Sequence, residues 1–182
     1  MSDPPRTVSA MGELVSLFSI GRRRDMRRAT SAIDHYERGL ACEERGDLDG
    51  AIAAYGRAIA GRPDLADAYN NLGRIHHDRG ELGDAESLYR LAICAARTVA
   101  LYWFNLGVAL EDRSRAAEAI AAYEHALALD ATLADAHFNL ARQLERAAGS
   151  ACGRSVDEIV LRRAVRHLAR YRDLARHQPI FK

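Results

Sequence analysis

The stretch YNNLG, residues Tyr69–Gly73, decides the fold because the chain repeats it at a fixed interval. WFNLG follows at Trp103–Gly107 and HFNLA at His137–Ala141, a spacing of 34 residues each time. Self-similarity at a period of about 20 to 50 residues is typical of repeat proteins, in which every repeat is one supersecondary unit. We therefore expect an array of similar units.

Four further sets of residues keep the same phase, and helix packing explains them. The sets are Gly46, Gly80 and Ser114; Ala51, Ala85 and Ala119; Tyr55, Tyr89 and Tyr123; and Ala58, Ala92 and Ala126. Small residues such as the first set allow a helix to end, and alanine allows two helices to approach closely. Strands are not expected, because β-branched residues are few and two-residue alternation is rare. Each unit is predicted to be two amphipathic helices joined by a turn.

The combined pattern resembles the tetratricopeptide repeat. That family's signature is an aromatic residue, then Leu-Gly, a bulky residue, Ala and an aromatic residue, and often Pro. The units match at Trp103, Leu106, Gly107, Leu110, Ala119 and Tyr123; at Tyr69, Leu72, Gly73, His76, Ala85 and Tyr89; and at His35, Gly39, Cys42, Ala51, Tyr55 and Pro63. The resemblance implies an all-α, right-handed superhelical solenoid over about residues 32–175.

This resemblance divides the chain into segments. They are a basic extension with a helix at 1–31, units at 32–65, 66–99 and 100–133, a fourth unit plus cap at 134–178, and a tail at 179–182. Arg38 stands in place of the expected Leu, and the first helix should pack less well there. The loop Ala148–Ser155 interrupts the fourth unit. After it, Asp157–Ala175 is predicted to be one long capping helix with an apolar stripe, since a solenoid needs a terminal helix with a wet outer face.

The resemblance also implies a concave groove, lined by the first helix of each pair, that binds extended peptides or partner helices. The predicted lining residues are Asn71, Asn105, Asn139, Tyr36, Leu40, Asn70, Arg74, His77, Phe104, Val108, Phe138 and Arg142. Family members that capture the carboxylates of chaperone C-termini use other residue types where Tyr36 and Leu40 stand, so that partner class is not expected.

The three asparagines in phase, Asn71, Asn105 and Asn139, are the main candidate binding device. Asn costs a helix roughly half a kcal/mol relative to Ala, so its recurrence asks for a reason. In family members that bind peptides, an Asn at this place points into the groove, where its amide can both donate and accept. The alternative is that these residues are inherited consensus or bond to a neighbouring helix.

Composition and motifs limit the other function classes. No run of about 18 apolar residues predicts a transmembrane helix, and Arg22–Arg24 follow the apolar Leu14–Ile20, whereas a signal peptide has its basic residues first. Cys42, Cys94 and Cys152 lack zinc-type spacing and indicate reduced thiols in a cytoplasm. No phosphate loop, G-x-S-x-G or H-E-x-x-H motif occurs. We expect no enzyme activity and no cofactor.

A metal site is not expected either. His76, His77 and Asp78 are adjacent, and adjacent helical side chains diverge by about 100°. Cys152 is interpreted as an inert thiol, with a reactive one as the alternative. Of the 26 basic residues only Lys182 is lysine, a bias typical of a GC-rich bacterial genome.

Charge separates the two ends from the middle. The net charge of +1 combines +3 over residues 1–31, −7 over 32–153 and +5 over 154–182. The N-terminal Gly12–Ile20 with the arginines after it is predicted to dock on the first repeat or to self-associate. Binding to a membrane surface or to nucleic acid is not expected. The sequence thus favours a scaffold that binds a protein segment in its groove. The alternatives are a regulatory or chaperone-like adaptor with a second contact at its basic ends, and a self-assembly module.

Overall fold

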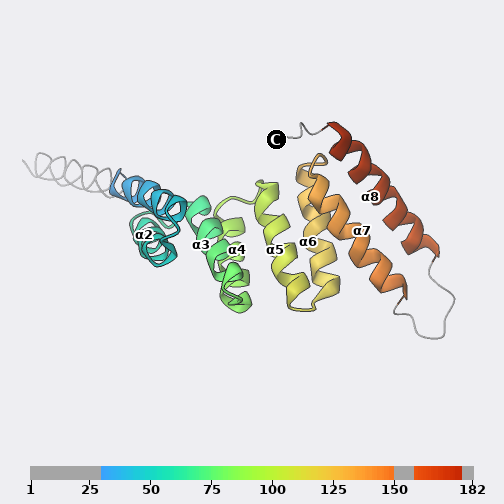
Figure 1. Ribbon diagram of the computed structural model, residues 1–182, viewed down its shortest axis with the longest axis horizontal. Helices are drawn as coiled ribbons and strands as arrows, with labels where there is room; N and C mark the ends of the chain where they lie inside the picture. The colour runs from blue at the N-terminus through green and yellow to red at the C-terminus, as the bar shows by residue number, and fades with distance from the viewer. Residues whose placement is uncertain (1–29, 150–157, 178–182) are drawn as a thin grey trace, which may run out of the picture. The chain divides into compact units, whose positions relative to one another are not determined.

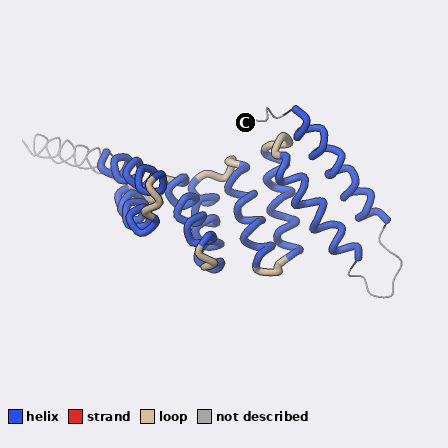
Figure 2. Tube along the Cα trace, viewed as in Figure 1, coloured by secondary structure: helices blue, strands red, loops and turns tan. Residues whose placement is uncertain are grey.

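The computed structural model describes residues 30–149 and 158–177. The chain forms two compact units, Met1–Pro63 and Asp64–Lys182, and we treat each by itself. Within the described residues every regular element is a helix, and short turns connect most of them (Figure 2). None of these helices is both long and apolar enough to cross a membrane. The predicted N-terminal helix at Gly12–Ile20 and Cys152 lie outside the described residues.

The first unit is a helical hairpin. Residues 30–44 are helical and α2 covers Leu48–Gly61. The turn between them uses Gly46 at φ 74°, a left-handed conformation that glycine adopts at little cost. Asp47 then caps α2, its carboxylate accepting from the Gly50 N–H at 2.9 Å. The helix ends before Pro63, as predicted.

The described residues of the second unit form six helices in chain order. They are α3 Ala66–Asp78, α4 Leu82–Ala95, α5 Ala100–Asp112, α6 Ala116–Leu129, α7 Ala134–Gly149 and α8 Glu158–His177. Each helix packs against the one that follows it (Figure 1). The pairs α3–α4 and α5–α6 lie within residues 66–99 and 100–133, and the chain is an all-α helical repeat solenoid. The helix α7 runs through Ala148 to Gly149, which corrects the predicted start of the loop.

Glycine and tyrosine hold the two helices of a regular pair together. A Cβ on Gly73 would lie 2.9 Å from the Tyr89 ring, and a Cβ on Gly107 would lie 2.5 Å from the Tyr123 ring. The contact of a first helix with the tyrosine of its second helix therefore requires glycine. The first unit repeats this contact with Gly39. The glycine series and the tyrosine series found in the sequence thus form one contact between the two helices of each pair.

The terminal pair α7–α8 packs differently. Ala141 occupies the place of the glycine, and both it and Ala164 of α8 are fully buried. His137 contacts His167 at ring centroids 5.1 Å apart, and Phe138 contacts Tyr171 at the same separation. The described residues of α8 are Glu158–His177, so the helix extends two residues beyond the predicted end at Ala175.

One charged side chain lies in the core of the second unit. Glu86 of α4 is 2% exposed, at the phase where α6 has Ile120. Arg90, Arg113 and Arg115 all donate to its carboxylate, Arg115 at 2.6 Å. Burial alone would raise the pKa of Glu86, but the three guanidinium groups bring that pKa below its usual value. The residue ties α4 to the turn between α5 and α6.

Candidate functional site

The predicted lining residues of the second unit lie on α3, α5 and α7, the first helices of successive pairs. Nine of these ten side chains we call the first-helix face: Asn71, Arg74, His77, Phe104, Asn105, Val108, Phe138, Asn139 and Arg142. The tenth, Asn70, is buried. Equal phase places them at matching helical positions. Side-chain contacts described below connect α3 to α5 and α5 to α7.

Asparagines connect α3 to α5. Asn105 Nδ2 donates to Asn70 Oδ1 at 2.8 Å, and Asn70 Nδ2 donates to Asn71 Oδ1 at 3.3 Å. Asn70 is only 6% exposed, so it is a buried hydrogen-bond partner of both Asn71 and Asn105. Asn139 bonds to the Tyr123 hydroxyl. The predicted asparagines therefore have partners within the protein that hold their amides in place, and Asn105 makes the bond to a neighbouring helix that the sequence left open as the alternative.

Ion pairs form a second set of contacts on this face. His77 Nε2 donates to Asp112 Oδ2 at 2.8 Å, again from α3 to α5. Arg142 donates to Glu111, and Arg146 donates to the same carboxylate at 3.1 Å, from α7 to α5. Burial alone would raise the pKa of Glu111, yet Arg142 and other hydrogen-bond donors bring it below its usual value. Glu111 is therefore ionised at neutral pH.

Apolar side chains lie between these polar contacts. Phe104 packs on the Tyr123 ring with centroids 5.9 Å apart, and Val108 is half-buried. Phe138 is 38% exposed, and the Arg142 guanidinium lies over its ring at 5.8 Å. A partner can thus meet exposed aromatic surface beside oriented amides.

The remaining predicted residues belong to the first unit. Tyr36 is half-buried and its ring lies 5.6 Å from that of Tyr55. Leu40 is 39% exposed. Both are on the first helix of that unit, as the phase predicts.

Sequence reasoning missed three residues that organise the face, namely Glu111, Asp112 and Arg146. A signal for Glu111 was present. Tyr123 donates to Glu111 at 3.1 Å, and in the first unit Tyr55 donates to Glu43 at 2.6 Å. The two pairs have the same spacing of 12 residues, so the phase could have identified Glu111 as the tyrosine's partner. Nothing in the phase indicates its arginines.

The face has the chemistry of a non-covalent binding surface. It combines amides that donate and accept, ion pairs and partly exposed aromatic rings. Within the described residues of the face no cysteine or serine lies beside a histidine as an activated nucleophile would.

Family models match the repeats directly. A model described as TPR repeat matches residues 39–80, and two described as Tetratricopeptide repeat match 65–100 and 100–133. Together they span residues 39–133, just over half of the chain. A search of curated proteins gave no match.

Solved structures show the same fold. A crystal structure of MamA protein is 22% identical with a TM-score of 0.68, covering 80% of this chain and 74% of its own. The first TPR of Spaghetti (RPAP3), bound to the HSP90 peptide SRMEEVD, is 22% identical with a TM-score of 0.64, covering 66% and 95%. The Arabidopsis OM64 TPR domain is 22% identical with a TM-score of 0.63, covering 65% and 98%. With the repeats, their phase and these matches in agreement, the chain belongs to the tetratricopeptide repeat family.

Proposed function

We propose that this protein is a non-enzymatic scaffold that holds an extended segment of a partner protein across the first-helix face, in a cytoplasm. Tetratricopeptide repeats are protein–protein interaction modules. The observation that carries the finer proposal is the hydrogen-bonded run from Asn71 through Asn70 to Asn105. A binding group that is already held in place loses less conformational entropy when the partner arrives.

The charge on the face limits the kind of segment. Arg142 and Arg146 share the single carboxylate of Glu111, and His77 is hydrogen-bonded to Asp112. A partner with a terminal carboxylate would have to break these pairs, so the acidic peptide held by the Spaghetti (RPAP3) structure is not the expected type. Exposed aromatic surface at Phe138 favours a segment with one or two large apolar side chains.

The test is affinity capture from a native lysate with three proteins compared by mass spectrometry. They are the intact chain, the combined Asn71→Ala, Asn105→Ala, Asn139→Ala variant, and Phe138→Ala. Each hydrogen bond contributes about 0.5–1.5 kcal/mol, so the triple variant should lose a partner that the intact chain retains. Phe138→Ala should weaken the same partner, because it removes an apolar contact.

A matched control removes apolar side chains from the second helices. Leu91 of α4 and Leu129 of α6 are 47% and 44% exposed, and Leu91→Ala, Leu129→Ala should retain the partner. Circular dichroism must show unchanged helix content in every variant, since Asn105 also supports Asn70. If the asparagine variant and the leucine variant retain the same partner equally, binding does not use this face.

A second candidate, an adaptor with an acidic second partner, is favoured by the charge of α8. The helix carries six arginines against two acids. A contact of this kind should weaken steeply as salt rises, most steeply for a nucleic acid. Binding through the first-helix face should tolerate moderate salt.

A further inference from the structure

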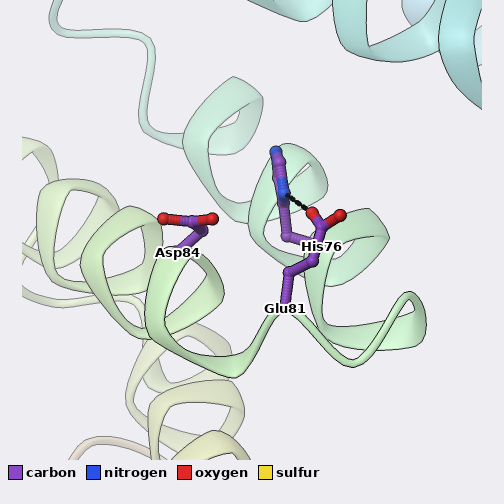
Figure 3. Close-up of side chains that lie close together, drawn as sticks. All are labelled: His76, Glu81 and Asp84. Atoms are coloured by element: carbon purple, nitrogen blue, oxygen red, sulfur yellow. Dashed lines mark hydrogen bonds and ion pairs between the residues drawn. The ribbon is translucent and has the colours of Figure 1, made fainter.

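Three metal-ligating side chains converge at the turn between α3 and α4. They are His76, Glu81 and Asp84, and one donor atom from each lies within 4.8 Å of the other two (Figure 3). His76 Nδ1 donates to Glu81 Oε2, and Asp84 faces this pair from α4. His76 is 21% exposed and Glu81 is 46% exposed, so solvent ions reach the cluster.

The backbone fixes the positions from which these side chains start. His76 lies in the last turn of α3, Glu81 is the N-cap of α4 and Asp84 is in its first turn. Gly80 adopts φ 78°, and the Glu81 N–H donates to the His76 carbonyl at 2.9 Å. The turn therefore returns the chain so that positions 76, 81 and 84 share one side of the hairpin.

The same three positions in the other repeats do different work. In the first unit they are Cys42, Asp47 and Gly50, and Asp47 caps α2 through the Gly50 N–H. In the pair α5–α6 they are Leu110, Arg115 and Glu118, and the last two form an ion pair. Glu81 makes no side-chain capping bond to α4; its carboxylate is directed to His76 instead. Helix capping does not account for this arrangement.

We propose that His76 Nδ1, Glu81 and Asp84 bind one divalent transition-metal cation of the Zn²⁺ type. One imidazole and two carboxylates suit Zn²⁺ and its neighbours in the first row, whereas Ca²⁺ and Mg²⁺ prefer sites made of oxygen only. Donors of a tetrahedral zinc ion lie about 3.4 Å apart. In the structure the donor atoms lie within 4.8 Å of one another. The exposed side chains of Glu81 and Asp84 can rotate to shorten these distances, and water completes the coordination. The two carboxylates offset the charge of the ion.

The site differs from the arrangement considered in the sequence. His77 and Asp78 follow His76 directly, but His77 turns to Asp112 of α5. The third ligand comes instead from the next helix, which the turn brings back. The site shares no residue with the first-helix face, so the two proposals can fail separately.

The test is a titration of metal-free, tag-free full-length protein with Zn²⁺ by calorimetry, followed by Co²⁺ spectroscopy. The intact chain should bind one equivalent that His76→Ala removes, with an affinity loss of at least tenfold, and Asp84→Asn should weaken binding by a similar factor, since each deletes one of three ligands. The Co²⁺ complex should lack the thiolate charge-transfer band that a cysteine site would give.

The matched control is His77→Ala, which removes the neighbouring histidine and should leave the Zn²⁺ affinity unchanged. Asp84→Asn keeps the shape of an exposed side chain. It replaces His76→Ala as the test variant if His76→Ala changes the helix content. Equal uptake with equal affinity by the intact chain, His76→Ala and Asp84→Asn would overturn the proposal. So would a thiolate band in the intact chain that Asp84→Asn leaves unchanged.

Discussion

The pairs α5–α6 and α7–α8 are neighbours in one array but are held together by different chemistry. In α5–α6, Gly107 lies under the Tyr123 ring, which is fully buried. In α7–α8, the corresponding position is Ala141, and the contact passes through the rings of His137 and His167. The difference shows that a repeat can hold its two helices together through an ionisable contact in place of a neutral one.

The hydrogen bonds of the two histidines explain why their contact needs a neutral His137 ring. His137 Nε2 donates to the Ala131 carbonyl at 3.1 Å. Its Nδ1 in the neutral ring is therefore an acceptor, and it receives the His167 Nδ1–H at 2.8 Å. A proton on this nitrogen of His137 would remove that acceptor. Tyr123, in contrast, has its pKa raised by burial and stays neutral at any physiological pH.

The largest expected effect comes from Gly107→Ala, which breaks the regular pair. The added Cβ would lie 2.5 Å from the Tyr123 ring, which is fully buried. Overpacking of this kind costs about 1–3 kcal/mol. Urea unfolding followed by circular dichroism should show a lower free energy of unfolding.

Gly83→Ala is the matched control, because nothing lies within 4 Å of a Cβ at Gly83. It should leave stability unchanged or raise it by up to about 1 kcal/mol. A loss from Gly83→Ala as large as that from Gly107→Ala would mean that the Tyr123 contact is not the cause.

Much of this packing was predictable because phase reports local geometry. The series of Gly73 and Gly107 and the series of Tyr89 and Tyr123 identify which helices pair. Glu86 was not predictable, because an isolated sequence gives no reason to bury a carboxylate where another repeat has isoleucine. Its arginines come from an adjacent turn, and only the tertiary structure brings them together.

The candidate site was predictable to the level of the helical face. The phase of Asn105 and Asn139 selects one side of the first helices. It does not reveal that Asn70 is buried or that it accepts from Asn105, since that bond joins residues 35 apart. Partners of this kind depend on the distance between helices, which sequence spacing alone does not specify.

Lowering the pH is the second test of the comparison. It should destabilise the pair α7–α8 at a higher pH than the pair α5–α6. Burial lowers the pKa of both His137 and His167; Arg163, Arg166 and Arg170 add to this effect, while Glu124 opposes it at His167. The unfolded chain then binds more protons than the folded chain as pH falls below about 6.5, so stability falls with pH in that range. Hydrogen exchange at about pH 7 and pH 5.5 should show a loss of protection in α8.

The variant His167→Asn sharpens this result, because asparagine can still donate to His137 but does not titrate. Its dependence of stability on pH should be shallower than that of the intact chain. The carboxylates Glu86 and Glu111 do not contribute to the pH dependence in this range. Their pKa values are lowered, so their protonation destabilises the fold only at more acid pH. Equal loss of protection in α6 and α8 would contradict a local role for the histidine pair.

Arg163→Ala should have the smallest effect and asks whether charge or packing holds α8. Arg163 donates to Glu124 of α6, and the two side chains are 39% and 43% exposed. Solvent screens such pairs, which contribute about 0–1 kcal/mol. Urea unfolding should therefore show a free energy of unfolding that changes by less than that amount. Arg162→Ala is the control, since Arg162 pairs only with Glu158 within α8 among the described residues. If Arg163→Ala costs far more than Arg162→Ala and more than about 1 kcal/mol, the end of the array depends on its surface charge. If both variants change the free energy of unfolding by similar small amounts, α8 is held mainly by packing. That packing consists of the buried Ala141 and Ala164 and the two ring contacts.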